Sequence, residues 1–581
     1  MLWKKFKTKW YFDYVCYLWT AVFATLAFAP YNYSIFSLLS PLGLFWIEDK
    51  YKRNYKILLK KGLFFSFIFC LCSYYWINYM LVVFGGFNKI IAFLFFILYT
   101  LIVNWKFGVF LVSFSFLKSK LGKRNFFLVG FCILFAEFFT WQIFPWYYGN
   151  LLASNIILAQ NIEFLGIYGL SALVFIFSYS IYKFPYKVFI KKSSKFNLVL
   201  KSNLLPFLLL SFFSISGFYL YQKWEKVEPS STKQVVIIQP DAPLEFRDDR
   251  NPRETLNKLM ERIESLALDS VIEGKPDIFV LPESGVPFFS THNDNATTLY
   301  EPLYWWRYEA LIYQLTNRFK ANFYLNEVDA SFLENKQNKE NLVHHNNSVL
   351  FDPNGERREI YRKSYLLAFG EYFPLGETFP IVYKIFPQVA RFVPGNEQNL
   401  ISYYKNKTNS DFKKSHLKWQ DSSFMNMQAH KDYYKENQTE LEIAGKFLPL
   451  ICYEVIIPEF VRKFYKTEMP DFIINITNDK WYGETVESYE HLDLARIRSI
   501  EYRRWMVRST NSGTSAFIDH LGRIVDDNKT PLMKSLYHSG KVSVISSEPS
   551  FYLKFGNILS WLYLGLFTFY SLSIYIIKKN N

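Results

Sequence analysis

Long apolar segments dominate the first 222 residues and constrain the fold more than any other feature of the chain. A membrane-spanning helix needs about 20 mostly apolar residues. Seven segments approach that length before residue 223, and an eighth lies near the C-terminus. They cover residues 12–29, 31–47, 62–84, 90–115, 125–141, 160–182, 203–222 and 556–577. We therefore expect a bundle of about eight transmembrane helices.

The positive charge of the chain belongs to this apolar half. Residues 1–222 contain 22 Lys and Arg against 5 Asp and Glu, a net charge of +17, whereas residues 223–581 contain 44 against 46, a net charge of −2. A nucleic-acid site needs its basic side chains on a folded polar surface. The sequence therefore argues against nucleic-acid binding.

Lys and Arg also crowd alternate connections between the apolar segments. They gather at both chain ends and in connections 50–61, 118–124 and 183–201, whereas connections 84–88 and 141–162 contain none. Cytoplasmic loops of membrane proteins carry the excess of Lys and Arg. With seven spans before it and one after it, the polar segment 223–555 is expected outside the cytoplasmic membrane.

The polar segment has the pattern of an α/β domain with mixed sheets. Runs rich in Val, Ile and Phe alternate with amphipathic helical patterns. Predicted strands cover 233–239, 277–281, 321–326, 447–453 and 471–476, and predicted helices cover 251–272 and 302–320. We expect a membrane domain over 1–222, the α/β domain over 223–555, a polar surface insertion over 401–446, and a C-terminal transmembrane helix with a cytoplasmic tail over 556–581.

Cysteine usage argues against a disulfide framework and against a zinc site. Four of the five cysteines lie inside apolar runs, where a thiol is ordinarily a small packing residue. The fifth, Cys452, stands alone in the polar half. Disulfide frameworks and zinc sites need several thiols or His ligands at short spacing. We expect no metal and no cofactor.

Three reactive side chains fall at the ends of predicted buried strands: Glu283 after Ile278-Phe-Val-Leu-Pro, Lys363 after Tyr361-Arg, and Cys452 after Leu448-Pro-Leu-Ile. Each alone has a structural explanation, as a cap, a solvated lysine or a core thiol. Together they meet the needs of covalent acyl chemistry. Because a thiol with a pKa of about 8.5 is mostly protonated at neutral pH, it needs a base such as Glu283 or a cation such as Lys363.

The order Glu, Lys, Cys in these contexts resembles the carbon-nitrogen hydrolase (nitrilase) superfamily, whose fold is an α-β-β-α sandwich. With the membrane half in front, the chain resembles the apolipoprotein N-acyltransferase family. Further matching motifs are Leu26-Ala-Phe-Ala-Pro-Tyr31, Phe144-Pro-Trp146, Asn478-Asp-Lys-Trp-Tyr-Gly483, His491-Leu-Asp-Leu-Ala-Arg496-Ile-Arg498 and Arg508-Ser-Thr-Asn-Ser-Gly513.

The resemblance implies a role for each site residue. Glu283 is expected as the general base, Lys363 as the cation that faces the oxyanion, and Cys452 as the nucleophile. Glu371, Tyr453 and Glu454 are expected in supporting roles, and structural salt bridges are the alternative for Glu371 and Glu454. Trp146, Phe373 and Trp481 are expected to contact substrate.

The resemblance also implies the activity: transfer of an acyl chain from a membrane phospholipid to the N-terminal amine of a diacylated apolipoprotein, by a monomer in the bacterial inner membrane with its catalytic domain on the periplasmic side. Two alternatives stay open. A membrane-tethered amidohydrolase would share the three residues. A transporter or receptor with an outer binding domain would use membrane charges, of which Lys106, Glu137 and Glu163 are the candidates.

Overall fold

The chain divides into two compact units. The computed structural model describes residues 7–83, 85–103, 105–121, 126–185, 196–243, 252–285, 305–332, 342–368, 370–373, 376, 378–379, 381–385, 391–407, 427–435, 438–466 and 468–580. The helical unit comprises Met1–Lys226, Thr485–Tyr502 and Pro549–Asn581, and the α/β unit comprises Val227–Glu484 and Arg503–Glu548. Thr485–Tyr502, expected within the α/β domain, thus groups with the helices.

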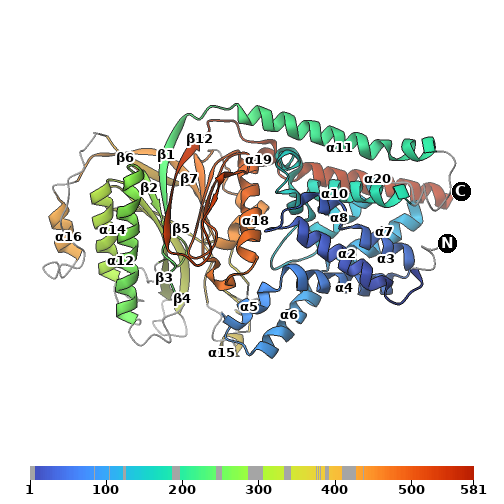
Figure 1. Cartoon of the computed structure of the whole chain (residues 1–581), viewed down its shortest axis with the longest axis horizontal. Coiled ribbons are helices and arrows are strands. Elements are labelled where there is room, and N and C mark those ends of the chain that lie inside the picture. Colours follow the sequence, from blue (N-terminus) through green and yellow to red (C-terminus); the bar gives the residue numbers. More distant parts are fainter. Residues whose placement is uncertain are drawn as a thin grey trace. The chain divides into compact units, whose positions relative to one another are not determined.

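The helical unit is built from helices of very different lengths, most of them apolar (Figure 1). They are α2 (Phe12–Ala27), α3 (Leu42–Lys50), α4 (Tyr55–Ser73), α5 (Trp76–Val83), α6 (Lys89–Val103), α7 (Lys106–Leu121), α8 (Phe127–Phe139), α9 (Ile156–Ala159), α10 (Ile162–Pro185), α11 (Phe196–Glu225), α18 (Glu487–Tyr502), α19 (Phe551–Phe555) and α20 (Ile558–Asn580). Helices α4 and α7 pack closely, because a Cβ added to Gly62 would lie 2.3 Å from the Cα of Gly108.

Several of these helices suit a membrane. Among the described residues, three helical stretches are long and apolar enough to cross one, namely Lys89–Leu121, Ile162–Lys183 and Leu204–Glu225. The pair α4 and α5, bent by 69°, makes a fourth if it counts as one span. The span expected at 31–47 is not one continuous helix: a short 3-10 helix, Ser34–Leu38, is followed by α3, whose nine residues reach about 14 Å.

The membrane charges considered for a transport site have partners inside the helical unit. Lys106 donates from Nζ to the backbone oxygen of Trp146 at 2.7 Å. Glu137 accepts the backbone N–H of Tyr148 at 2.8 Å, and Glu163 accepts the indole N–H of Trp224 at 2.8 Å. These bonds fix loops and helix ends, so structural roles explain all three charges.

Two six-stranded sheets form the α/β unit. The first has the order β12-β1-β2-β3-β4-β5, and the second has the order β11-β10-β9-β8-β7-β6. The first sheet contains β1 (Ser231–Gln239), β2 (Ile278–Val280), β3 (Asn322–Phe332), β4 (Leu342–Phe351), β5 (Arg357–Arg362) and β12 (Leu536–Val544). The second contains β6 (Ile401–Asn406), β7 (Leu441–Ile451), β8 (Phe472–Thr477), β9 (Met506–Thr510), β10 (Ala516–Ile518) and β11 (Ile524–Lys529).

The sheets pack face to face, and helices cover the first sheet. Tyr324 of β3 meets Phe447 of β7 with ring centroids 4.8 Å apart. On the outer face of the first sheet, α12 (Pro252–Ser270) and α14 (Trp305–Phe319) bury an apolar core with the strands (Figure 1). Three short helices complete the unit: α15 (Ile381–Ile385), α16 (Met427–Tyr434) and α17 (Pro458–Arg462). The expectation of an α/β fold with two sheets is confirmed.

The bounds expected for the surface insertion were too wide. Ile401–Asn406 forms the edge strand β6 and pairs antiparallel with the first part of β7, so both ends of 401–446 belong to the sheet. Ile401 and Tyr403 are buried on the inner face of the strand. Alternation of apolar and polar residues in Ile401-Ser-Tyr403 is the strand pattern that the polar composition obscured. Residues 408–426 and 436–437 lie outside the described residues.

Candidate active site

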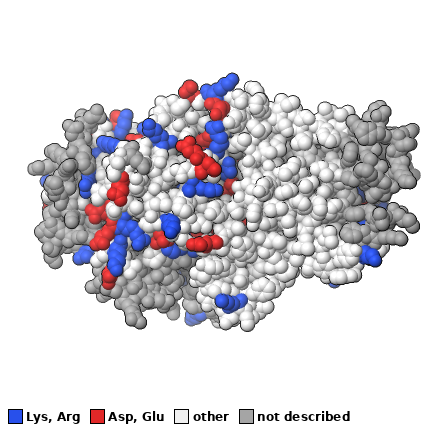
Figure 2. All heavy atoms as spheres, viewed as in Figure 1, with Lys and Arg blue, Asp and Glu red and all other residues white. Residues whose placement is uncertain are grey.

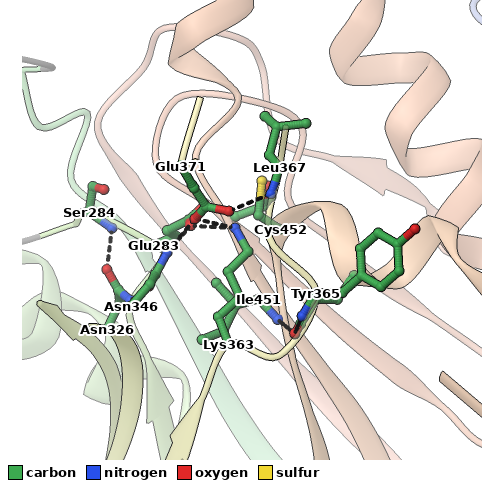
Figure 3. A network of polar contacts seen from close by, with 12 residues as sticks. Glu283, Ser284, Asn326, Asn346, Lys363, Tyr365, Leu367, Glu371, Ile451 and Cys452 are labelled. Atoms are coloured by element: carbon green, nitrogen blue, oxygen red, sulfur yellow. Dashed lines mark hydrogen bonds and ion pairs between the residues drawn. The ribbon is translucent and has the colours of Figure 1, made fainter. Parts of the chain in front are cut away.

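The ends of three strands bring the reactive side chains together. Glu283 follows β2 by three residues, Lys363 directly follows β5, and Cys452 directly follows β7. All three are buried. In Figure 3 the amine of Lys363 points toward the carboxylates of Glu283 and Glu371, and Cys452 lies next to this group. The strand-end positions that the sequence indicated thus converge in one place.

Lys363 is the cation at the centre of the site. Its Nζ lies 2.7 Å from Oε1 of Glu371 and 3.4 Å from Oε1 of Glu283. Burial opposes the charge of the ammonium, but Glu283 and Glu371 outweigh that penalty and raise the pKa of Lys363 above its ordinary value. The lysine therefore stays protonated at neutral pH, and its positive charge is available to an oxyanion.

Cys452 sits in a strained turn. Its φ of 52° lies in the left-handed region, which a residue with a Cβ rarely adopts. The turn ends β7 and starts the 3-10 helix Cys452–Ile456, so the thiol is presented at the tip of a sharp bend. Burial is the main reason that the pKa of the thiol is raised well above 9, and Glu283 adds to this, whereas Lys363 opposes it. The thiol is protonated at rest and needs a base.

Glu454 joins the cysteine turn to the lysine turn. Its Oε2 accepts the backbone N–H of Ile451 at 2.9 Å, just before the nucleophile. Its Oε1 accepts the backbone N–H groups of Ser364 at 2.7 Å and Tyr365 at 3.0 Å, and the hydroxyl of Tyr361 at 2.7 Å. Burial raises the pKa of Glu454 to about 7, although these donors and Lys363 favour its charged form. Glu454 acts on backbone geometry and forms no ion pair with Lys363 among the described residues.

Two asparagines that we did not expect from the sequence complete the site. Asn346 on β4 donates from Nδ2 to Oε1 of Glu283 at 2.8 Å and to Oε1 of Glu371 at 3.0 Å. Asn326 on β3 donates to Oδ1 of Asn346 at 2.7 Å. Both side chains are buried. The available signal was Asn326 at the end of the predicted strand 321–326, because Asn is uncommon in strands, whereas no predicted strand covered Asn346.

The three residues expected to contact substrate lie in different surroundings. Trp146 is only 1% exposed and stacks on Phe69 inside the helical unit with ring centroids 4.5 Å apart, and its contact with substrate stays a prediction. Phe373 and Trp481 belong to the α/β unit and are both half-buried. Residues 286–304 and 374–375 lie outside the described residues.

Comparison with known proteins covers both halves of the chain. Residues 20–180 match the apolipoprotein N-acyltransferase N-terminal domain, and residues 249–531 match the carbon-nitrogen hydrolase family. Apolipoprotein N-acyltransferase 2 of Leptospira interrogans is 47% identical over 98% of this chain and 97% of its own. The chain belongs to the apolipoprotein N-acyltransferase family. Apolipoprotein N-acyltransferase 1 of the same species is 30% identical over 93% of this chain and 92% of its own.

Glu283, Lys363 and Cys452 of this acyltransferase all fall within the region that matches the carbon-nitrogen hydrolases. The membrane charges have structural partners, and the reactive side chains converge on one thiol. The transporter and receptor alternatives therefore have no support from the site of this acyltransferase.

Proposed function

We propose that this acyltransferase moves an acyl chain from a membrane phospholipid to the N-terminal amine of the diacylglyceryl-cysteine of apolipoproteins, through a thioester on Cys452. The observation that carries the proposal is the convergence of a buried thiol, a buried cation and the Glu283 carboxylate at the ends of β7, β5 and β2, with the Glu371 carboxylate beside the cation. The names of the relatives supply the substrate class.

In the first half-reaction Cys452 attacks the ester carbonyl of the phospholipid while Glu283 takes the thiol proton. The new S–C bond leaves charge on the carbonyl oxygen, which Lys363 faces together with a backbone N–H near Tyr453. Collapse of this intermediate breaks the ester C–O bond, and Glu283 returns the proton to the departing lysophospholipid oxygen.

In the second half-reaction the apolipoprotein amine attacks the thioester. Glu283 takes a proton from the amine, the C–N bond forms, and the C–S bond breaks. The thiol of Cys452 then regains its proton from Glu283. A thioester is reactive toward amines, so one site accepts the chain from an ester and delivers it as an amide. Glu371 holds Lys363 in place through both steps.

We further propose that the helical unit lies in the inner membrane with about eight spans and that the α/β unit faces the periplasm. Support comes from the alternating Lys and Arg content of the connections. Figure 2 shows charged side chains gathered over the α/β unit on this face, whereas the helical unit shows a largely uncharged surface. Leu208 and Phe212 on α11 and Phe569 on α20 are exposed apolar side chains of the helical unit. We also propose that the protein acts as a monomer.

Phe373 and Trp481 are proposed to line the path by which lipid chains reach Cys452. Both are large, half-buried and part of the α/β unit. Exclusion of water is what separates acyl transfer from hydrolysis of the thioester. A polar substitution at Phe373 is therefore expected to raise the share of free fatty acid among the products.

The experiment that tests the function supplies purified full-length protein with phospholipid and a diacylated lipopeptide. The proposal predicts a triacylated lipopeptide and a lysophospholipid in equal amounts. Release of free fatty acid without any triacylated lipopeptide would support the membrane-tethered amidohydrolase instead. Cys452→Ala is the matched control and should form neither product.

A further inference from the structure

The hydrogen bonds of Asn326 and Asn346, the two buried asparagines next to the carboxylates, allow only one orientation of each side-chain amide. The backbone N–H of Ser284 can only donate, and it donates to Oδ1 of Asn326 at 2.9 Å. The backbone oxygen of Asn347 can only accept, and it accepts from Nδ2 of Asn326 at 2.7 Å. Two backbone groups therefore fix which end of the Asn326 amide faces which way.

The fixed amide of Asn326 in turn fixes the orientation of the Asn346 amide. The second N–H of Asn326 donates to Oδ1 of Asn346, so the oxygen of Asn346 is turned away from the carboxylates. The amide nitrogen of Asn346 then faces Glu283 and Glu371 and gives one N–H to each. All four amide N–H groups of Asn326 and Asn346 are used (Figure 3).

The carboxylates of Glu283 and Glu371 share two donors, so the four side chains form a closed ring of contacts. Asn346 and Lys363 each contact Oε1 of Glu283 and Oε1 of Glu371. The other oxygen of Glu371 accepts the backbone N–H of Leu367 at 2.8 Å. Within the part of the chain that the structure describes, every hydrogen bond to Glu283 reaches Oε1. Oε1 is thus occupied as an acceptor, and Oε2 is the oxygen left to receive a proton.

We propose that Asn326 and Asn346 are positioning residues that form a relay, meaning two hydrogen-bonded amides whose orientation is fixed. The relay holds Glu283 and Glu371 around Lys363. It directs the proton of Cys452 to Oε2 of Glu283. The proposal rests on the proposed role of Glu283 as the base. The relay keeps two like charges together in a buried site, because each carboxylate meets one N–H of Asn346 and the Lys363 ammonium.

The test replaces N–H donors of the relay with oxygen acceptors and measures the reactivity of the Cys452 thiol. Asn346→Asp places a third carboxylate beside Glu283 and Glu371. Asn326→Asp keeps the acceptor for Ser284 but removes both N–H donors, so Asn346 must turn its oxygen toward the carboxylates. In both variants the thiolate of Cys452 loses stabilisation. The midpoint of its pH-dependent alkylation by iodoacetamide should rise by about 1 to 3 pH units.

Asn322→Asp is the matched control. Asn322 lies four residues before Asn326 on β3 and likewise uses both amide N–H groups, which donate to the backbone oxygens of Asp277 and Tyr404 at 3.0 and 2.8 Å. The same substitution there removes the same kind of bonds outside the site. It should lower thermal stability to a similar extent and leave the alkylation midpoint of Cys452 unchanged. Mass spectrometry of the Cys452 peptide from full-length protein separates this thiol from the other four.

Asn346→Ala adds no buried charge and keeps the test open if the Asp variants fail to fold. It should slow formation of the acyl-enzyme by about 10- to 100-fold, the value of a hydrogen bond to a charged group, without a matching rise in KM for phospholipid. Wild-type alkylation midpoints in folded Asn346→Asp and Asn326→Asp, or a wild-type acylation rate in Asn346→Ala, would overturn the relay. Shifted midpoints in a protein whose wild type accepts no acyl chain from phospholipid would leave the relay standing and overturn the proposed function.

Discussion

The carboxylate of Glu454 accepts the backbone N–H of Ser364 at 2.7 Å, and this bond ties the turn after the nucleophile to the turn after the lysine. The two turns come from different sheets, β7 of the second and β5 of the first. The distance between thiol and ammonium therefore depends on a residue that needs no contact with the substrate. This arrangement explains why a buried carboxylate follows the nucleophile by two residues.

Glu454→Gln should change how stability depends on pH. Burial raises the pKa of the folded Glu454 to about 7 from an ordinary value of 4.5. Because the unfolded chain releases this proton at lower pH than the folded chain, the stability contributed by the carboxyl falls as pH rises from 4.5 to 7. The free energy of unfolding of the wild type, measured relative to Glu454→Gln, should decrease between pH 5 and pH 7. An increase over that range would contradict the environment described for Glu454.

Lys363→Met should remove both activity and stability. The substitution leaves Glu283 and Glu371 facing each other in a buried site without their shared cation. Loss of one partner from a buried charge cluster costs about 3 to 5 kcal/mol of unfolding free energy. The double variant Lys363→Met/Glu371→Gln removes one of the opposed charges and should recover part of the stability but none of the activity. Thermal unfolding and acyl-enzyme formation measure the two effects, and an active double variant would show that the cation is dispensable.

Cys452→Gly should be more stable than Cys452→Ala. Both variants lack the thiol and differ only by a Cβ at a φ of 52°. In an ordinary helix or strand glycine is the less stable residue by about 0.5 to 1 kcal/mol, but in the left-handed region the Cβ costs about 1 to 2 kcal/mol. Comparison of the two denaturation midpoints isolates this strain. An alanine variant of equal or greater stability would mean that the turn around Cys452 is relaxed.

The sequence indicated Glu283 and Cys452 because each lies within three residues of the end of a recognisable apolar strand. Lys363 instead follows Arg357–Arg362, a partly exposed strand with three arginines. Parallel strands of a buried sheet read as unbroken apolar runs, so Glu283 and Cys452 stood out as the first reactive groups after them. The asparagines did not stand out. Asn326 and Asn346 lie inside β3 and β4 with no motif around them, and their function depends on which faces of the two strands oppose each other.

The helical unit shows a second limit of prediction from sequence. Hydropathy over 31–47 resembled a span because Leu, Phe and Ile are frequent there, but Pro41 immediately precedes α3 and leaves the preceding residues outside that helix. Ion pairs within this unit could not be predicted from the sequence either. Asp13 is bonded to Lys50 at 2.7 Å and to Lys61 at 2.6 Å, contacts between segments that sequence periodicity does not connect.

Mass spectrometry of the intact protein after incubation with phospholipid alone tests the central claim most directly. The account predicts one acyl chain per protein, attached to Cys452 as a thioester that hydroxylamine removes and that a diacylated lipopeptide discharges into a triacylated product. Formation of triacylated lipopeptide by protein that carries no acyl chain on Cys452, or by Cys452→Ala, would contradict it.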